Sequence, residues 1–154
     1  MSKILCIETT NIVSVSLHVD DKTLLGSLES RELYAHSVKI ISLIQQLLQE
    51  TQTAWSEIDT ILINKGPGSF TGMRIGLAAA LGFQLSTHAA VKSCRSFEIL
   101  AGEEALYKHS TLILIDSKRS DYYAAVKDPD QYSIKNIFVT DIKIIFLHAK
   151  EIIQ

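Results

Sequence analysis

The sequence predicts an α/β fold in which a mixed β-sheet carries helices against its faces. Three observations lead to this prediction. Three short strand patterns follow one another near the start, residues 34–50 repeat apolar side chains with a helical period, and the apolar run 58–64 leads through a glycine-rich loop into another helix. A three-stranded meander followed by helical crossovers gives a sheet with both antiparallel and parallel strands.

The first strands are predicted at residues 3–8, 13–19 and 23–28. In the second of them, Val13, Val15 and Leu17 alternate with serines, which is the pattern of a half-buried strand. The polar residues 20–22, Asp-Asp-Lys, separate the second and third strands and are expected to form a hairpin turn.

Residues 34–50 form the clearest helix in the sequence. Its apolar side chains span roughly 160° of a helical wheel, whereas a helix resting on one sheet needs a stripe of only about 100°. The surplus width suggests contact with a second surface, and His36 and Ser37 lie at the edges of the same stripe. The apolar residues of the stripe are Ile40, Ile41, Leu43, Ile44, Leu47 and Leu48.

A polar connection at residues 51–56 leads to the buried strand 58–64, the glycine-rich loop and a second helix at about residues 71–85. The loop is neither a Walker loop nor a dinucleotide-binding fingerprint, because the required Gly-Lys-Ser/Thr ending and glycine spacing are absent. A structural turn and a phosphate cradle at the helix start both remain open readings. The loop residues are Gly66, Pro67, Gly68, Ser69, Phe70 and Thr71.

The helix after the loop is almost free of charge, since Arg74 is the one charged residue between Thr71 and Thr87. Gly72, Gly76 and Ala80 recur every four residues and predict a smooth ridge for close helix approach. A helix that is apolar nearly all round must be covered on more than one side. The second cover is either the helix at 34–50 or another molecule.

The later elements are predicted in the same way: a strand at 91–94, a helix at 97–107, and a hairpin of strands 111–116 and 122–127 around the charged turn 117–121. Strands at 137–139 and 143–147 and a short terminal helix are weaker expectations. Residues 1–110 are thus predicted to form a complete ribonuclease-H-like subdomain that carries the two helices. Residues 111–154 restart the pattern as a second, shortened half.

Composition narrows the class of protein. The chain has 154 residues, 47% of them hydrophobic and 21% charged, with a net charge of −2, so a broad electrostatic footprint for nucleic acid is not expected. We expect no signal peptide and no membrane span, because the apolar stretches are short or interrupted. Cys6 and Cys94 are isolated in the sequence, which favours a reduced, cytoplasmic protein. The histidines show no metal-binding spacing, so no metal site is predicted.

Four segments of the sequence resemble the TsaB family, also known as YeaZ, which takes part in making threonylcarbamoyladenosine in tRNA. They are residues 4–10, the helix that begins with His36 and Ser37, residues 66–76 and residues 114–119, in the family's order and spacing. The run Gly-Pro-Gly-Ser-Phe-Thr-Gly followed by Met-Arg-Ile-Gly is the most specific of them. The resemblance covers about residues 3–127.

This resemblance implies an actin-like ATPase fold, built from two ribonuclease-H-like halves, and a non-catalytic subunit. Such a subunit would bind and activate a TsaD-like catalytic subunit, which a TsaE-like ATPase joins, and would meet tRNA only through the complex. A homodimer is a further expectation for the chain alone, and ATP and Mg²⁺ are expected, if anywhere, at the assembled complex. The implied interface consists of His36, Ser37, Ile40, Ile41, Ile44, Gly72, Met73, Gly76, Leu77 and Ala80.

An enzyme with its own nucleotide site is the alternative. Glu8 ends the first strand where family members usually carry Asp, and Thr9 and Thr10 follow it, so these residues are a candidate vestigial nucleotide site for an actin-like ATPase or phosphotransferase. A ribonuclease-H-like nuclease ranks last because it needs three or four clustered carboxylates, and only Glu8 and Asp116 are suitably placed. Asp59 starts its strand and so belongs to the opposite end. Lys118 and Arg119 are expected at a solvated hairpin tip, with tRNA contact a minor alternative.

Overall fold

The structure is a computed structural model of the whole chain, in which residues 1–20, 23–31, 36–102, 110–119, 121–127 and 135–140 are described. Two compact units make up the chain. The first consists of Met1–Lys65 and Ser69–Cys94, and the second of Gly66–Gly68 and Arg95–Gln154. The predicted boundary at residue 110 falls inside the second unit, and the division into subdomains at that point stays a prediction.

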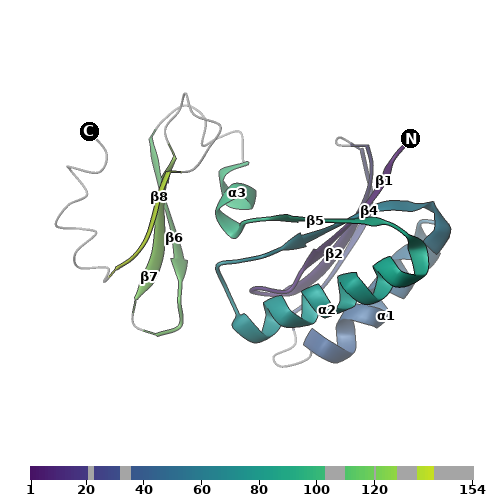
Figure 1. Cartoon of the computed structure of the whole chain (residues 1–154), viewed down its shortest axis with the longest axis horizontal. Helices are drawn as coiled ribbons and strands as arrows, with labels where there is room; N and C mark the ends of the chain where they lie inside the picture. Colours follow the sequence, from purple (N-terminus) through teal and green to yellow (C-terminus); the bar gives the residue numbers. More distant parts are fainter. Residues whose placement is uncertain (21–22, 32–35, 103–109, 120, 128–134, 141–154) are drawn as a thin grey trace. The chain divides into compact units, whose positions relative to one another are not determined.

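The first unit is built on a five-stranded mixed sheet with the strand order β3-β2-β1-β4-β5 (Figure 1). The strands are β1 (Lys3–Glu8), β2 (Val13–Val19), β3 (Thr23–Ser30), β4 (Ile58–Asn64) and β5 (Ala90–Cys94). β2 pairs antiparallel with both β1 and β3, whereas β4 pairs parallel with both β1 and β5. The predicted mixed sheet is therefore confirmed, and β3 is two residues longer than the predicted strand 23–28.

Two helices cover one face of this sheet. α1 (His36–Glu50) packs against β2 and β3, α2 (Phe70–Thr87) packs against β4, β5 and β1, and the two helices contact each other. Between α1 and β4 lies the short 3-10 helix η1 (Trp55–Glu57). The Trp55 ring stacks on Phe83 of α2 with ring centroids 4.3 Å apart, which ties this connection to the helix layer.

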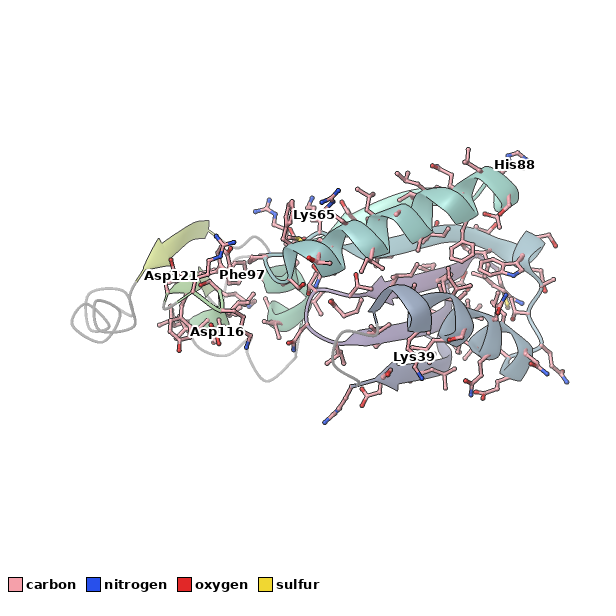
Figure 2. All side chains as sticks on the ribbon, turned by 90° about the horizontal axis from the view of Figure 1, so that it is seen from below. Lys39, Lys65, His88, Phe97, Asp116 and Asp121 are labelled. Carbon is pink, nitrogen blue, oxygen red and sulfur yellow. The ribbon has the colours of Figure 1, made fainter. Side chains whose placement is uncertain are left out.

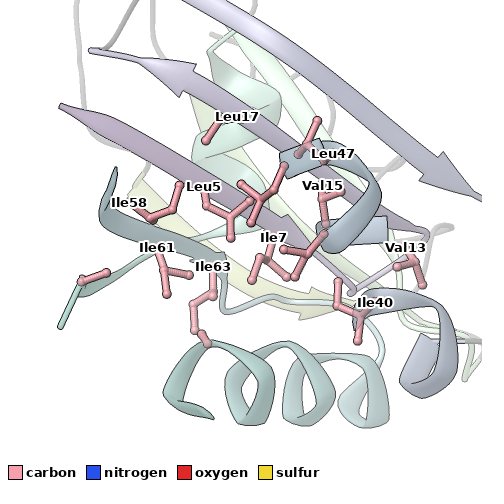
Figure 3. Close-up of a cluster of buried hydrophobic side chains, with 14 residues drawn as sticks. Leu5, Ile7, Val13, Val15, Leu17, Ile40, Leu47, Ile58, Ile61 and Ile63 are labelled. Carbon is pink, nitrogen blue, oxygen red and sulfur yellow. The ribbon is translucent and has the colours of Figure 1, made fainter. Parts of the chain in front are cut away.

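The core of the first unit lies between the sheet and the helices, as Figure 3 shows. Strand side chains with a period of two point into it, because successive residues of a strand face opposite sides of the sheet. Residues of α1 and of α2 belong to the same cluster and pack on the face of the sheet that the helices cover. Its buried members include Leu5, Ile7, Val13, Val15, Leu17, Ile40, Ile44, Leu47, Ile61, Ile63 and Ala80.

Local signals set the turns and helix ends. Asp20 has φ of 54° where the chain turns between β2 and β3, and aspartate tolerates this left-handed region better than most residues. His88 ends α2 in the left-handed conformation with φ of 60°, and its N–H donates to the Gln84 carbonyl oxygen over 3.0 Å.

The second unit contains α3 (Ser96–Ala101) and an antiparallel sheet with the order β6-β7-β8. These strands are β6 (Thr111–Asp116), β7 (Tyr122–Lys127) and β8 (Lys135–Thr140), so the predicted hairpin is confirmed with its predicted bounds. Phe97 and Ala101 of α3 pack with Ile113 and Ala125 of the hairpin. The rest of the helix predicted to residue 107, the strand predicted at 143–147 and the terminal helix lie outside the described residues.

Candidate functional site

The glycine-rich loop joins β4 to α2 through a tight turn. Gly66 has φ of 88°, a conformation that favours glycine, and the Gly66–Pro67 peptide bond is cis. Ser96 holds the loop from α3: its N–H donates to the Gly66 carbonyl oxygen over 2.9 Å and its hydroxyl to the Pro67 carbonyl oxygen over 2.7 Å. These bonds fix the backbone of the loop by contacts within the chain.

Ser69 caps the start of α2. Its hydroxyl accepts the Gly72 N–H over 3.1 Å, and its carbonyl oxygen accepts the Met73 N–H over 2.9 Å. Its own N–H donates to the Thr10 carbonyl oxygen over 2.7 Å. Two amides that a phosphate cradle would use are therefore engaged by the protein itself, which favours the structural-turn reading of this loop.

Gly72 and Gly76 let α2 approach the end of β1 at Thr9. A Cβ atom on Gly72 would lie 1.8 Å from the Thr9 carbonyl oxygen, and one on Gly76 would lie 2.5 Å from Thr9 Oγ1. The Thr9 hydroxyl donates to the Gly72 carbonyl oxygen over 2.8 Å. The small-residue ridge thus packs on the chain's own strand. The sheet therefore covers this ridge, α1 contacts α2 as well, and a further cover by another molecule stays a prediction.

The carboxylate of Glu8 lies in a hydrogen-bond cluster at the end of β1 and β4. It accepts the N–H of Thr10, the Thr10 hydroxyl over 2.6 Å and the side-chain amide of Asn64. The same Asn64 amide also donates to Thr10 Oγ1 over 3.1 Å, and Thr9, Thr10 and Asn64 are buried. Glu8 therefore caps the strand end. Asn64 was not singled out in the sequence, although its place at the end of a strand parallel to β1 was the available signal.

Asp59, the other acid of the first unit considered in the sequence, does not join Glu8. Asp59 lies at the start of β4 and accepts the Lys3 N–H over 2.7 Å, at the opposite end of β1, as predicted. Within the described residues, no three His, Cys, Asp or Glu side chains are grouped so that they could hold a metal ion.

Asp116 and its neighbours form the tip of the β6–β7 hairpin in the second unit. Its carboxylate accepts the Lys118 N–H over 2.7 Å and the Lys118 ammonium over 3.1 Å. These bonds, the backbone one first, hold the pKa of Asp116 below its usual range. Lys118 and Arg119 are exposed, in agreement with a solvated tip, and contact with tRNA at this tip stays a prediction.

Cys6 lies on the face of the five-stranded sheet that α1 and α2 do not cover. It is paired in register with Ser16 of β2, whose hydroxyl is 3.0 Å from Nε2 of His18. Burial raises the pKa of the Cys6 thiol, and the hydrogen bond with Ser16 opposes this only in part. A thiol held in its neutral form is a poor nucleophile, so this burial does not favour a reactive cysteine.

An exposed apolar stripe runs along the outer side of α2. Phe70, Leu77, Leu81 and Leu85 are exposed, and at 100° per residue they lie within about 80° of one another. Figure 2 shows side chains along this helix from the end near Lys65 to the end near His88. Ile41 of α1 is also exposed. We call these five residues, Phe70, Leu77, Leu81, Leu85 and Ile41, the apolar stripe.

The predicted interface residues divide into two groups. Ile40, Ile44, Gly72, Gly76 and Ala80 are buried in the chain's own fold, so their side chains are not open to a partner. Ile41 and Leu77 are exposed and Met73 is half-buried. His36 and Ser37 lie at the start of α1, where the side chains are outside the described part. An interface on these helices stays a prediction. Two of its predicted residues, Ile41 and Leu77, belong to the apolar stripe.

None of the helices in the described part of the chain combines the length and apolar character that a membrane crossing needs.

Comparison with known proteins gives consistent matches. Residues 32–143 match the family model described as TsaD, tRNA N6-adenosine threonylcarbamoyltransferase. The tRNA threonylcarbamoyladenosine biosynthesis protein TsaB of Buchnera aphidicola subsp. Schizaphis graminum is 27% identical over 80% of this chain and 60% of its own length. TsaB of Bacillus subtilis is 26% identical over 86% of this chain and 56% of its own length. The chain thus spans about 60% of the length of these curated relatives.

The solved structure of YeaZ from Pseudomonas aeruginosa has the same fold. It superposes with a TM-score of 0.75 and 22% identity, over 90% of this chain and 67% of the other. Together with the order of the five strands, this likeness confirms the predicted α/β, ribonuclease-H-like and actin-like fold class.

Proposed function

The chain belongs to the TsaD family and, within it, to the TsaB (YeaZ) proteins; on this premise we propose that it is a non-catalytic scaffold subunit of tRNA N6-threonylcarbamoyladenosine biosynthesis. It binds and activates a TsaD-like catalytic subunit, with a TsaE-like ATPase in the same assembly. It meets tRNA through the complex, works in the cytoplasm, and forms a homodimer when alone.

The apolar stripe is the observation that carries this proposal. A helix facing only water normally carries charged side chains on its outer side, whereas Arg74 is the one charged residue of α2. Complete burial of a leucine, isoleucine or phenylalanine side chain is worth about 1.5–3 kcal/mol, so covering the exposed parts of five such side chains is a sizeable driving force. Rigid helices that present adjacent apolar side chains are suited to pack against helices of another subunit.

The hydrogen bonding at the end of β1 supports a non-catalytic role. The oxygens of Glu8 accept donors from Thr10 and Asn64, and the amides of Ser69 and Gly72 are engaged within the chain. To bind a nucleotide at this end of β1, the Glu8 carboxylate and the two backbone amides would have to give up these hydrogen bonds. In this proposal ATP and Mg²⁺ therefore act at the assembled complex.

Binding to a purified TsaD-like protein tests the proposal. The variants Leu77→Asp and Leu81→Asp place a carboxylate on the apolar stripe, where a desolvated charge opposes association. We expect each to raise the Kd at least about tenfold, as for a central apolar contact of an interface. Substitutions at Gly76 or Ile44 are unsuitable, because both residues are buried in the chain's own fold.

Leu24→Asp is the matched control. Leu24 is 54% exposed, close to the 46% of Leu81, but it lies on β3 rather than on the helix layer. We expect this variant to bind as the wild type does and to support the same rate of threonylcarbamoyl transfer to tRNA by the partner. Folded Leu77→Asp and Leu81→Asp proteins that bind and activate the partner normally would refute the proposed interface.

A further inference from the structure

Arg74 gives the apolar stripe a charged end. Its guanidinium lies over the Phe70 ring, with Cζ 5.6 Å from the ring centroid, and both side chains are exposed. At 100° per residue Arg74 lies about 40° from Phe70, between the directions of Leu81 and Leu85, so it lies on the same side of α2 as the apolar stripe. Within the described residues, no carboxylate forms an ion pair with it.

A subunit that covers the apolar stripe must also cover this cation. A buried charge without a partner is costly, because it loses its hydration and gains nothing in return. The guanidinium presents a planar set of N–H donors that matches a carboxylate, and the Phe70 ring beneath it limits its motion. The covering surface therefore needs an acidic side chain at the end of α2 where the helix begins.

We propose that the partner presents a helix with apolar side chains opposite Leu77, Leu81 and Leu85 and an Asp or Glu opposite Arg74. This inference rests on the proposed function and names the chemistry of the partner. Because the charge sits at one end of an otherwise neutral stripe, the pair sets the direction in which the partner helix docks.

A second copy of the chain satisfies this requirement less well. α2 contains no Asp or Glu, so a symmetric contact between two α2 helices places no carboxylate from α2 opposite Arg74. The described outer side of α1 offers Glu50 at its end, and the Glu50 carboxylate already accepts the Gln46 side-chain amide over 2.8 Å. A different subunit is therefore the favoured occupant.

Charge reversal tests the pair. With the purified TsaD-like protein as the probe, we expect Arg74→Glu to raise the Kd at least about tenfold at low salt and Arg74→Gln to raise it less. The Kd of Arg74→Gln should also depend less on salt than that of the wild type. Changing single Asp or Glu residues on the partner's helices to Lys should identify one that restores binding of Arg74→Glu.

Lys92→Glu is the matched control for charge reversal. Lys92 is exposed on β5, and its neighbour Val91 packs towards the helices, so Lys92 faces the other side of the sheet. We expect this variant to bind within about twofold of the wild type, as is usual for a charge outside an interface. Circular dichroism and urea midpoints of all variants show that they are folded.

The outcomes separate this inference from the proposed function. If Leu81→Asp abolishes binding and Arg74→Glu leaves the Kd within twofold, the proposed carboxylate opposite Arg74 is refuted, whereas the proposed function is not. If Leu81→Asp binds normally, the interface on the apolar stripe is refuted and this inference with it, whereas the proposed function fails if the wild type does not bind the TsaD-like protein. If Arg74→Glu abolishes self-association and adding Glu50→Lys restores it, the carboxylate belongs to a second copy. If Arg74→Glu weakens only tRNA binding, Arg74 contacts phosphate. Either result overturns the proposal.

Discussion

Replacing Gly72 with alanine should separate the two roles that glycine can have in α2. An alanine in the middle of a helix is favoured over glycine by about 0.8–1.0 kcal/mol, so an open position gains stability from this change. At Gly72, however, the added Cβ would lie 1.8 Å from the carbonyl oxygen and 2.9 Å from the carbonyl carbon of Thr9. Both of these are backbone atoms, which cannot rotate away.

The expected cost follows from this geometry. To reach an ordinary carbon–oxygen contact of about 3.3 Å, the helix must move by more than 1 Å away from β1, and overpacking of this kind costs about 1–3 kcal/mol or more. The movement also weakens the bond from the Thr9 hydroxyl to the Gly72 carbonyl oxygen, which is worth about 0.5–1.5 kcal/mol. After the gain in helix propensity is subtracted, we expect Gly72→Ala to destabilise the fold by about 0.5–4 kcal/mol.

Urea unfolding at equilibrium measures this difference, with Gly82→Ala as the matched control. Gly82 lies on the same helix, and a Cβ there would meet no atom within 4 Å. We expect Gly82→Ala to be as stable as the wild type or more stable by up to about 1 kcal/mol. If Gly72→Ala is as stable as Gly82→Ala, then α2 does not contact β1 as described and the burial of the glycine ridge is wrong.

Two further predictions concern acidic groups of the first unit. Glu8→Gln should lower the free energy of unfolding by about 1–3 kcal/mol, because the new amide faces donors that the carboxylate accepts; an unchanged urea midpoint would contradict the cluster. The pKa of Glu57 is lowered by the Lys3 ammonium, 2.8 Å from its carboxylate, and by the Ala54 N–H. A lowered pKa contributes stability above the usual glutamate value, about 4.3, and this contribution is lost as the pH falls through the lowered pKa. The thermal midpoints of wild type and Glu57→Gln should therefore differ at pH 7 and converge in acid, and a pH-independent difference would contradict the contact.

The order of the elements could be predicted from the sequence because each carries a local signal. Alternation in β2, the helical period in α1 and the glycine loop before α2 are properties of neighbouring residues, and the structure confirms the elements they predict. Element ends were less predictable. β3 continues to Ser30 because Val13 and Ser14 pair with its last residues, a contact between strands that the pattern of β3 alone does not contain.

The direction in which α2 faces could not be predicted in the same way. Its side chains are apolar nearly all round, so helical periodicity does not indicate which side meets the sheet. Glycines at Gly72 and Gly76 are compatible with close approach to any backbone, whether of another helix or of a strand. The structure assigns them to Thr9, and this assignment leaves Leu77 and Leu81 on the outer side.

The outer sides of α1 and α2 carry few charged side chains, Lys39 and Glu50 on α1 and Arg74 on α2, and the packing of the chain does not require so few. On α1 the exposed residues after Ile41 are Ser42, Gln45, Gln46 and Gln49 until Glu50 ends the helix, and on α2 Arg74 stands alone. Charged side chains at exposed positions would preserve both helices and favour solubility. Neutral side chains at these positions instead reduce the desolvation that a covering subunit must overcome. Arg74, the one charged residue of α2, is then the feature by which a partner of the right charge is distinguished from one that is merely apolar.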